Sequence, residues 1–217
     1  PSAGSCRTMK PLLLCTDLDR TLIPNGAQPE SPQARPLFAR LASCREVTLA
    51  YVTGRHLGLV EEAIETFDLP TPDYAIADVG ATLYRSGVGR WQRWKAWDAR
   101  ISPDWAGASH AELCVLLRDF AELHLQEPQK QSRHKLSFYV PLTVDVQRLI
   151  AQVQARLSEY DISVNLIWSI DEATHQGLLD ILPARANKLR AIEFLMQARG
   201  FLREQVVFAG DSGNDLD

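Results

Sequence analysis

The chain has 217 residues, of which 46% are hydrophobic, and its 23 Lys and Arg against 27 Asp and Glu leave a formal net charge of −4. This is the composition of a globular protein with one sizeable core, or with a core domain and a smaller one. No basic stripe suggests a nucleic-acid partner. No apolar run approaches the ~20 residues that a membrane-spanning helix needs.

The first third of the chain alternates between apolar runs and amphipathic segments. This rhythm predicts strands at 11–16, 46–54 and 73–80, with helices at 31–43 and 57–69 between them. Ser31 is the expected N-cap of the first helix, with Pro32 at its first position. Strands that alternate with helices favour an α/β fold with a mostly parallel sheet covered by helices.

The residue pattern changes in the middle of the chain and predicts a small α+β module with antiparallel strands. A Trp-, Arg- and Gly-rich block at 87–105 precedes it. The expected elements are a helix at 109–126, a strand at 134–142, a helix at 143–160, and strands at 162–169 and 177–183. The alternation of amphipathic and apolar segments then returns, with a helix at 187–200 and a buried strand within 205–215.

Four cysteines occur, Cys6, Cys15, Cys44 and Cys114, and none of them forms a CxxC pair. Zinc binding and thioredoxin-type chemistry are therefore not expected. Cys15 lies in an apolar strand and Cys114 in a predicted helix, where each fits a small core residue. Without a secretory signal or a disulfide framework, we expect a reducing, cytoplasmic compartment.

Polar residues follow several of the predicted strands. Asp17 and Asp19 follow the first strand, Thr53-Gly54-Arg55 the second and Asp211-Ser212-Gly213-Asn214-Asp215 the last, and Lys188 opens the helix before that strand. Because ligands bind beyond the carboxyl ends of parallel strands, these groups should meet at one edge. Several carboxylates together require a cation or shifted pKa values, and oxygen-only ligands favour Mg2+.

These motifs resemble those of the haloacid dehalogenase-like (HAD) phosphatase superfamily: "DLDRT", "VTGR", Lys188 and "GDSGND" match its four motifs in order. The resemblance implies a Rossmann-like core. It also implies that Asp17 is the nucleophile and that Asp19 is the general acid and base. Thr53 and the Gly54 N–H would bind the phosphoryl oxygens, and Lys188 would neutralise the charge of the phosphate and of Asp17.

The same resemblance implies a Mg2+ site. Its ligands would be Asp17, the backbone carbonyl of Asp19, Asp211 and Asp215. Ser212 or Asn214 would support this metal shell.

The inserted module falls where this superfamily carries its larger, C2-type cap. The resemblance therefore divides the chain into a first core part at 9–87, a cap at 88–183 and a second core part at 184–217. Segments such as "PDYAIADVGATLYR", "HKLSFYV" and "LLDILPARANK" are similar to those of sucrose-phosphate phosphatases. The implied reaction is hydrolysis of sucrose 6-phosphate to sucrose and phosphate, with a small sugar phosphate as the ligand.

Two alternatives remain open from the sequence. One is another capped sugar phosphatase, for example one that acts on mannosyl-3-phosphoglycerate. The other is a non-catalytic phosphatase-like module that binds sucrose-phosphate synthase. The intact Asp17 and Asp19 argue against the second alternative.

In the cap, Lys135 and Asp180 are candidate ligands of the sugar hydroxyls, and an acid inside "LLDILP" needs a partner. Trp91, Trp94 and Trp97 are spaced by three, so we expect them on one helical face, where packing is the favoured role. Arg20 stands where the related pattern often has Asn, and it could face either the phosphate or the solvent.

At the ends, we take Met9 as a natural start and leave residues 1–8 out of the fold. The chain stops shortly after the fourth motif, so we expect an open sheet edge and a truncated second core part.

Overall fold

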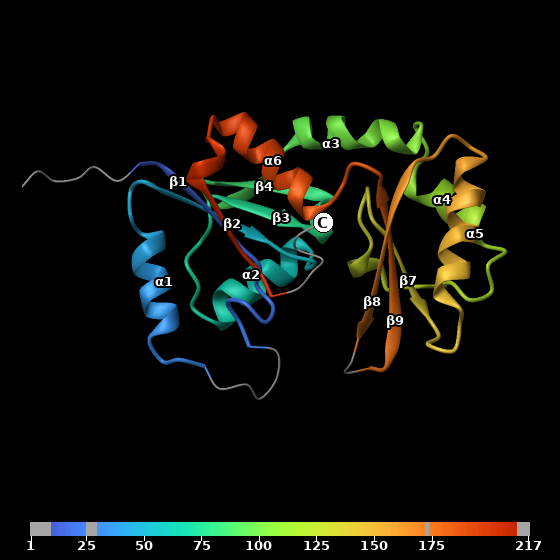
Figure 1. Cartoon of the computed structure of the whole chain (residues 1–217), viewed down its shortest axis with the longest axis horizontal. Helices are drawn as coiled ribbons and strands as arrows, with labels where there is room; N and C mark the ends of the chain where they lie inside the picture. The colour runs from blue at the N-terminus through green and yellow to red at the C-terminus, as the bar shows by residue number, and fades with distance from the viewer. Residues whose placement is uncertain (1–9, 25–29, 172–173, 212–217) are drawn as a thin grey trace, which may run out of the picture.

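The chain folds into two lobes, each built on its own sheet (Figure 1). The structure is a computed structural model, which describes residues 10–24, 30–171 and 174–211. None of the helices in these residues is both long enough and apolar enough to pass through a bilayer.

The larger lobe contains the predicted, mostly parallel sheet. Its strand order is β10 (Val206–Ala209), β1 (Leu12–Thr16), β2 (Val47–Val52), β3 (Tyr74–Ala77), β4 (Thr82–Gly87) and β5 (Arg90–Arg93). The first four strands run parallel, and the hairpin of β4 and β5 adds two antiparallel strands. The carboxyl ends of β1, β2, β3 and β10 therefore lie along one edge, as the sequence predicted.

Helices cover both faces of this sheet. One face packs against α1 (Ala34–Ala42) and α2 (Leu57–Thr66), and the other against α3 (Lys95–Ile101) and α6 (Lys188–Arg199). This three-layer arrangement buries the apolar strands on both sides, which explains why β1 and β2 are almost uniformly apolar.

The predicted cap on α1 is wrong. The helix begins at Ala34 with Gln33 as its N-cap, and no side chain caps it. Ser31 lies further upstream, where its backbone carbonyl accepts a hydrogen bond from the Ala34 N–H.

The smaller lobe, here called the cap, is an antiparallel sheet with two helices on one face. The strand order is β6 (His124–Leu125), β7 (Leu136–Val140), β9 (Gln176–Pro183) and β8 (Val164–Asp171). The helices α4 (His110–Leu117) and α5 (Val146–Ser158) pack on apolar side chains such as Leu136, Phe138, Leu179 and Ile181. Side chains alternate along a strand, so the other face of this sheet is left to face the larger lobe (Figure 1).

The helix predicted at 109–126 is shorter in the structure. A capping box of Ser109 and Glu112 starts α4, which ends at Leu117. The residues after it turn back so that His124 and Leu125 pair with β7, and the Gln126 N–H donates to the carbonyl of Ser137. Sheet pairing overrides the helical propensity of this segment.

Most of the Trp-rich block belongs to the larger lobe, whereas Trp105 at its end packs in the core of the cap. Trp91 lies on β5, Trp94 precedes α3 and Trp97 lies within α3, so the three do not share a helical face as expected. Their packing role holds: Trp94 stacks on Tyr74 with ring centroids 5.6 Å apart, and Trp97 is fully buried.

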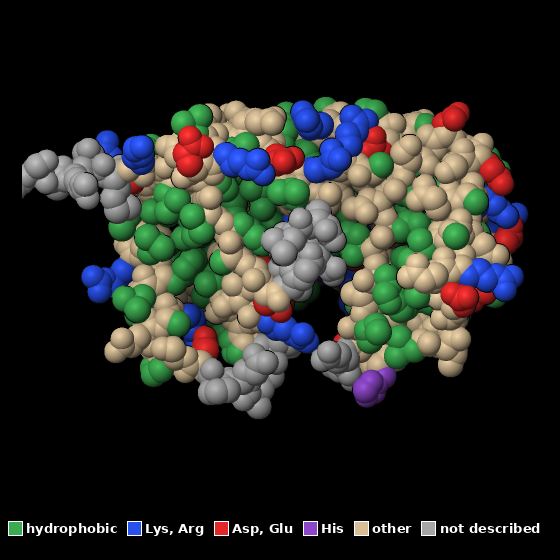
Figure 2. Space-filling view, in the orientation of Figure 1, with side chains coloured by type: hydrophobic (Ala, Val, Ile, Leu, Met, Phe, Trp, Pro, Cys, Tyr) green, Lys and Arg blue, Asp and Glu red, His purple; other side chains and the backbone are tan. Residues whose placement is uncertain are grey.

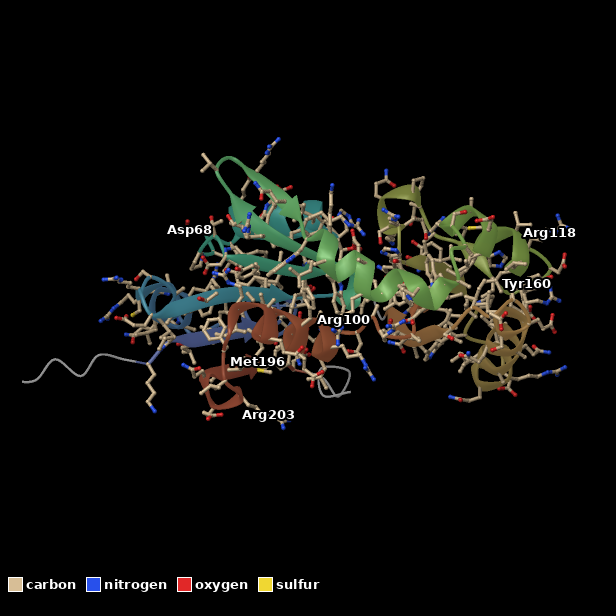
Figure 3. The ribbon with its side chains drawn as sticks, turned by 90° about the horizontal axis from the view of Figure 1, so that it is seen from above. Asp68, Arg100, Arg118, Tyr160, Met196 and Arg203 are labelled. Atoms are coloured by element: carbon tan, nitrogen blue, oxygen red, sulfur yellow. The ribbon has the colours of Figure 1, made fainter. Side chains whose placement is uncertain are left out.

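The β5 strand and α3 were expected in the cap, which was predicted to begin at residue 88. In the structure β5 pairs with β4, and α3 packs on the larger sheet. Seen from above, α3 lies over the larger lobe and points toward the cap, with Arg100 near the middle of the molecule (Figure 3). Asp68 and Arg203 lie at the larger-lobe end, and Arg118 and Tyr160 at the cap end (Figure 3).

Short 3-10 turns connect several elements, at Asp78–Gly80, Ser102–Trp105, Pro128–Lys130 and Arg203–Gln205.

Candidate active site

Hydrogen bonds from the backbone and from both carboxylate oxygens hold Asp17 at the end of β1. Its backbone N–H donates to the carbonyl of Ala209 on the neighbouring β10. Its Oδ1 accepts from the Leu18 N–H at 2.7 Å, and its Oδ2 accepts from Lys188 Nζ, also at 2.7 Å. The residue is only 6% exposed. A buried carboxylate that is fixed at both oxygens has one orientation, which is what a nucleophile requires.

Lys188 reaches Asp17 from the first turn of α6. The helix is capped by Asn187, whose side chain accepts from the Arg190 N–H. Lys188 is itself 8% exposed, so the ion pair with Asp17 is buried on both sides. The structure thus brings together two predicted site residues that are 171 positions apart in the chain.

The turn after β3 holds α6 in this place. Asp78, Val79 and Gly80 all have positive φ angles, of 52°, 58° and 94°. A Cβ on Gly80 would lie 2.3 Å from the carbonyl carbon and oxygen of Asn187. Only glycine allows the turn to approach the start of α6 so closely.

The residues after β2 connect to the same turn. The Val79 N–H donates to the Thr53 carbonyl, and the Asp78 N–H donates to the Arg55 carbonyl. Thr53 is fully buried, and its hydroxyl accepts from the Arg55 N–H at 3.2 Å. The second motif, the turn after β3 and the start of α6 therefore form one continuous hydrogen-bonded and packed unit.

Arg55 is a site residue to which the sequence prediction gave no role. Its guanidinium donates two hydrogen bonds to Asp19, from Nε at 2.9 Å and from the NH2 group at 2.7 Å. These hydrogen bonds raise the pKa of Arg55. The "TGR" motif was the available signal, because an Arg at a strand end near a DxD motif can form such a bidentate pair.

A pocket of about 560 Å³ lies between the two lobes at this edge. Figure 2 shows a notch between the lobes at the lower edge of the molecule. Asp19, Gly54, Arg55 and Lys188 line the pocket from the larger lobe. Asp17 and Thr53 are not in its wall, but each directly adjoins a residue that is.

The cap contributes the opposite wall, which includes Lys135 and Asp180 as the sequence predicted. Asp180 accepts a hydrogen bond from the Ser137 hydroxyl at 2.5 Å, and Lys135 Nζ lies 3.9 Å from its other oxygen. The acid inside "LLDILP" thus has the expected partner. Lys135 is 7% exposed, so it is not a surface charge. Gln126, Lys130 and Asn165 add further polar groups to this wall.

Asp78, like Arg55, is a site residue to which the sequence prediction gave no role. It follows β3 as Asp17 follows β1, and this position was the signal that could have found it. Burial raises the pKa of its carboxyl, and the opposing effects of the Lys135 charge and of the hydrogen bond from the Thr82 hydroxyl do not cancel this rise. Its Oδ1 is buried and has no hydrogen-bond partner among the described residues.

The predicted metal ligands are only partly described. Asp17 and Asp211 follow the neighbouring strands β1 and β10, whose Thr16 and Ala209 are paired. Asp215, Ser212 and Asn214 lie outside the described residues. Within the described part no three acidic, His or Cys side chains converge on one point. The two predicted carboxylate ligands within the described residues, Asp17 and Asp211, follow neighbouring strands and offer only oxygen atoms, which suit a hard cation such as Mg2+.

Arg20 does not line this pocket. Its backbone has a φ of 59°, and it borders a separate cavity of about 260 Å³ with Ile23, Glu30 and Arg35. Of the two orientations open from the sequence, the one toward the phosphate pocket is not observed.

Comparison with known proteins agrees with this geometry. The family model of sucrose-6F-phosphate phosphohydrolase matches residues 10–217. A HAD-like hydrolase of Nitrosococcus oceani is 53% identical over 95% of this chain and 56% of its own length. A mannosylfructose-phosphate phosphatase of Agrobacterium fabrum is 31% identical over 95% of this chain and 78% of its own. This chain spans about half the length of several curated relatives that it matches.

Among solved structures, the sucrose-phosphatase of Synechocystis in complex with sucrose and phosphate superposes with a TM-score of 0.76. It is 28% identical, and the match covers 96% of this chain and 78% of that one. A haloacid dehalogenase-like hydrolase of Bacillus subtilis, at 15% identity and a TM-score of 0.65, shares the fold. With its two lobes, its strand-end motifs and a family match over residues 10–217, the chain belongs to the sucrose-6F-phosphate phosphohydrolase family of HAD-fold proteins.

Proposed function

We propose that the chain is a sugar-phosphate phosphatase that hydrolyses sucrose 6-phosphate to sucrose and phosphate. The observation that carries the proposal is the buried Asp17–Lys188 pair next to a pocket whose far wall carries the polar groups of Lys135, Asn165 and Asp180 among apolar side chains. A phosphoryl group bound by Lys188 and Gly54 at the larger lobe would direct its sugar toward the cap residues Lys135 and Asp180.

In the first step, an Asp17 oxygen attacks phosphorus while the bond from phosphorus to the sugar oxygen breaks. The electron pair goes to the sugar oxygen, which takes a proton from Asp19. In the second step, water attacks the aspartyl phosphate, Asp19 takes its proton, and phosphate leaves with Asp17 restored. The Lys188 ammonium offsets the negative charge of the phosphoryl oxygens throughout.

The bidentate pair with Arg55 has a place in this scheme. It fixes Asp19 in the pocket wall, on the side that faces the cap, where the oxygen of the departing sugar would lie. The Asp19 side chain is 42% exposed, so it can be reached from the pocket.

Mg2+ is the proposed cofactor. Asp17, the backbone carbonyl of Asp19, Asp211 and Asp215 would hold it, with Ser212 or Asn214 in support. When bound, it would neutralise charge on the phosphoryl oxygens.

The pocket favours a neutral sugar as the leaving group. Each Lys and Arg that lines it has an acid within 4.0 Å among the described residues: Arg55 with Asp19, Lys130 with Glu127, Lys135 with Asp180, and Lys188 with Asp17. A substrate with a second anionic group, such as mannosyl-3-phosphoglycerate, would have to displace one of these pairs. A sugar hydroxyl can instead bond to the charged groups as they stand.

A second candidate substrate is mannosylfructose phosphate, because the Agrobacterium relative is named for it. It also carries a neutral disaccharide. The binding-module alternative, with sucrose-phosphate synthase as partner, has less support because the Asp17–Lys188 and Asp19–Arg55 pairs are both formed. Free thiols at Cys15, Cys44 and Cys114 support the proposed reducing, cytoplasmic compartment.

The test is phosphate release from a panel of sucrose 6-phosphate, mannosylfructose phosphate and mannosyl-3-phosphoglycerate, with and without Mg2+. Asp17→Asn serves as the blank. We expect Mg2+-dependent release from sucrose 6-phosphate that the Asp17→Asn change abolishes. Equal rates with mannosyl-3-phosphoglycerate would refute the neutral-sugar argument, and release that persists in Asp17→Asn would refute the nucleophile.

A further inference from the structure

The Arg93–Asp98 ion pair and the His134 ring form a cluster beside the pocket, where the larger lobe meets the cap. Arg93 on β5 donates two hydrogen bonds to Asp98 on α3, at 2.7 and 2.9 Å. The Nδ1 atom of His134, in the cap, lies 3.5 Å from the Arg93 guanidinium and 3.7 Å from Asp98 Oδ1. Asp98 and His134 are 9% and 3% exposed, whereas the Arg93 side chain is 30% exposed, so water reaches the cluster mainly from the Arg93 side.

The histidine is also held from its other side. Its ring lies edge-on to Trp105, with centroids 5.8 Å apart and an interplanar angle of 71°. It is therefore fixed between an aromatic ring and an ion pair that belongs to the larger lobe. The bidentate Arg93–Asp98 pair on one side and the Trp105 ring on the other limit where the His134 ring can lie.

His134 directly precedes Lys135, and both belong to one tight turn. The Ser132 N–H donates to the Lys135 carbonyl at 3.0 Å, and the Lys135 N–H donates back to the Ser132 carbonyl at 3.3 Å. A turn closed in both directions moves as a unit, so fixing the His134 ring also fixes the backbone of Lys135 at the start of β7.

Lys135 is the residue that would be affected. Its ammonium lies in the pocket wall, 3.9 Å from Asp180, and its charge is the largest of the interactions that favour the ionised form of the buried Asp78. It is thus surrounded by acids of both lobes, Asp180 from the cap and Asp78 from the turn after β3. Four rotatable bonds would otherwise leave this ammonium free to adopt many positions.

We propose that His134, held by Asp98 and Arg93, is a positioning residue that sets Lys135 for the sugar hydroxyls in the pocket. This inference rests on the proposed function for its substrate, but the placement of Lys135 can be tested without any substrate. Because Arg93 and Asp98 belong to the larger lobe, the sugar-binding wall of the cap is set from the lobe that holds the phosphoryl site.

A second ion pair supplies the matched control. Asp104 accepts from the backbone N–H and the Nε of Arg185, both at 2.7 Å, and it joins the two segments that connect the lobes. Among the residues that the structure describes, it makes no hydrogen bond or ion pair with residues 132–135, and it does not line the pocket. Asp104→Asn therefore weakens the junction while it leaves the Arg93–Asp98–His134 contacts and the Trp105 side chain unchanged in composition.

The first experiment compares steady-state kinetics with sucrose 6-phosphate and with p-nitrophenyl phosphate, which lacks the sugar. We expect His134→Phe to raise KM for sucrose 6-phosphate about fivefold, as for one lost hydrogen bond. Its kcat/KM for p-nitrophenyl phosphate should stay within about twofold. His134→Asn, which keeps a polar group near the Nδ1 position, should restore most of the affinity for sucrose 6-phosphate. Asp104→Asn should leave both KM for sucrose 6-phosphate and kcat/KM for p-nitrophenyl phosphate unchanged.

The second experiment measures how fast an amine-reactive acetylating reagent modifies Lys135 in the intact 217-residue protein. Rates come from peptide mass spectrometry and are normalised to the exposed Lys10. We expect Lys135 to react at least about threefold faster in His134→Phe and in Asp98→Asn than in the wild type or in Asp104→Asn. This readout still decides the positioning role if the wild type hydrolyses none of the sugar phosphates, a result that would refute the proposed function alone.

Equal Lys135 labelling in His134→Phe, Asp98→Asn and Asp104→Asn would overturn the inference. A parallel loss of activity on both phosphates would also overturn it, because a general structural role predicts that pattern.

Discussion

Replacing Gly80 by Ala tests the close approach that places Lys188. Gly80 has a φ of 94°, and a Cβ there would lie 2.3 Å from backbone atoms of Asn187 and 2.7 Å from the Lys188 nitrogen. Backbone atoms cannot rotate away as a side chain can. The left-handed conformation costs a residue with a Cβ ~1–2 kcal/mol. Overpacking adds ~1–3 kcal/mol. We therefore expect Gly80→Ala to lower the free energy of unfolding by about 2–5 kcal/mol.

Gly89→Ala is the matched control. Gly89 also has a positive φ, of 70°, but no atom lies within 4 Å of its ideal Cβ. This variant should lose only the conformational part, ~1–2 kcal/mol. Urea unfolding followed by circular dichroism gives both values by linear extrapolation.

Activity provides a second measurement of the same approach. The displaced atoms begin α6, which carries Lys188, so kcat/KM should fall in Gly80→Ala and remain unchanged in Gly89→Ala. Equal destabilisation of the two variants would refute the steric argument, since both share the conformational cost and only one has the close contact.

Three further predictions follow from buried groups. Lys188→Met should lower the free energy of unfolding by ~3–5 kcal/mol in metal-free buffer, because it leaves the Asp17 carboxylate buried without its cation. The double variant with Asp17→Asn should be at least ~1 kcal/mol more stable than the sum of the single changes predicts. Additive losses would show that the two residues are not coupled. Burial raises the pKa of Asp98, but its interactions with His134 and Arg93 outweigh this effect and lower the pKa to about 2. A lowered pKa stabilises the fold above the unfolded value, so Asp98→Asn should cost about 2 kcal/mol at pH 6, a difference that disappears as the pH falls from ~4 toward ~2 in urea titrations. Burial raises the pKa of the Cys15 thiol to about 12, so iodoacetamide at pH 8 should modify it at least about a hundredfold more slowly in the native protein than in urea, and comparable rates would contradict its placement in the core.

The meeting of the strand-end residues could be predicted from the sequence because it follows from topology. Once the apolar runs are parallel strands, Asp17, Thr53 and Asp211 must lie at one edge, whatever their side-chain conformations. The same argument placed the start of the Lys188 helix near that edge, whereas the interaction of Lys188 with Asp17 was implied by the family resemblance.

The pairing of Arg55 with Asp19 could not be predicted in the same way. It depends on how two side chains 36 positions apart are oriented, and no periodicity encodes that orientation. Asp78 was missed because its positive φ and its burial arise from the packing of the turn against α6. Local propensity does not report that contact.

The errors in secondary structure have a common cause. The segment after Leu117 has helical composition but pairs with β7, and the spacing of Trp91 and Trp97 suits a helix although Trp91 lies on β5. In both places contacts distant in the sequence outweigh local preference. For the boundary expected at residue 88, the pairing of β5 with β4 leads us to propose that the cap begins after α3.

The Asp104–Arg185 pair has a consequence for how such a protein can change. The chain leaves the larger lobe near Asp104 and returns near Arg185, and the two crossings are stitched together by this pair and by the Ser163 N–H, which donates to the Asp104 carbonyl. Because the two ends of the inserted cap are fixed to each other, changes within the cap need not move the larger lobe. Substitutions and insertions in the cap can therefore change which substrate is recognised, while Asp17 and Lys188 keep their positions.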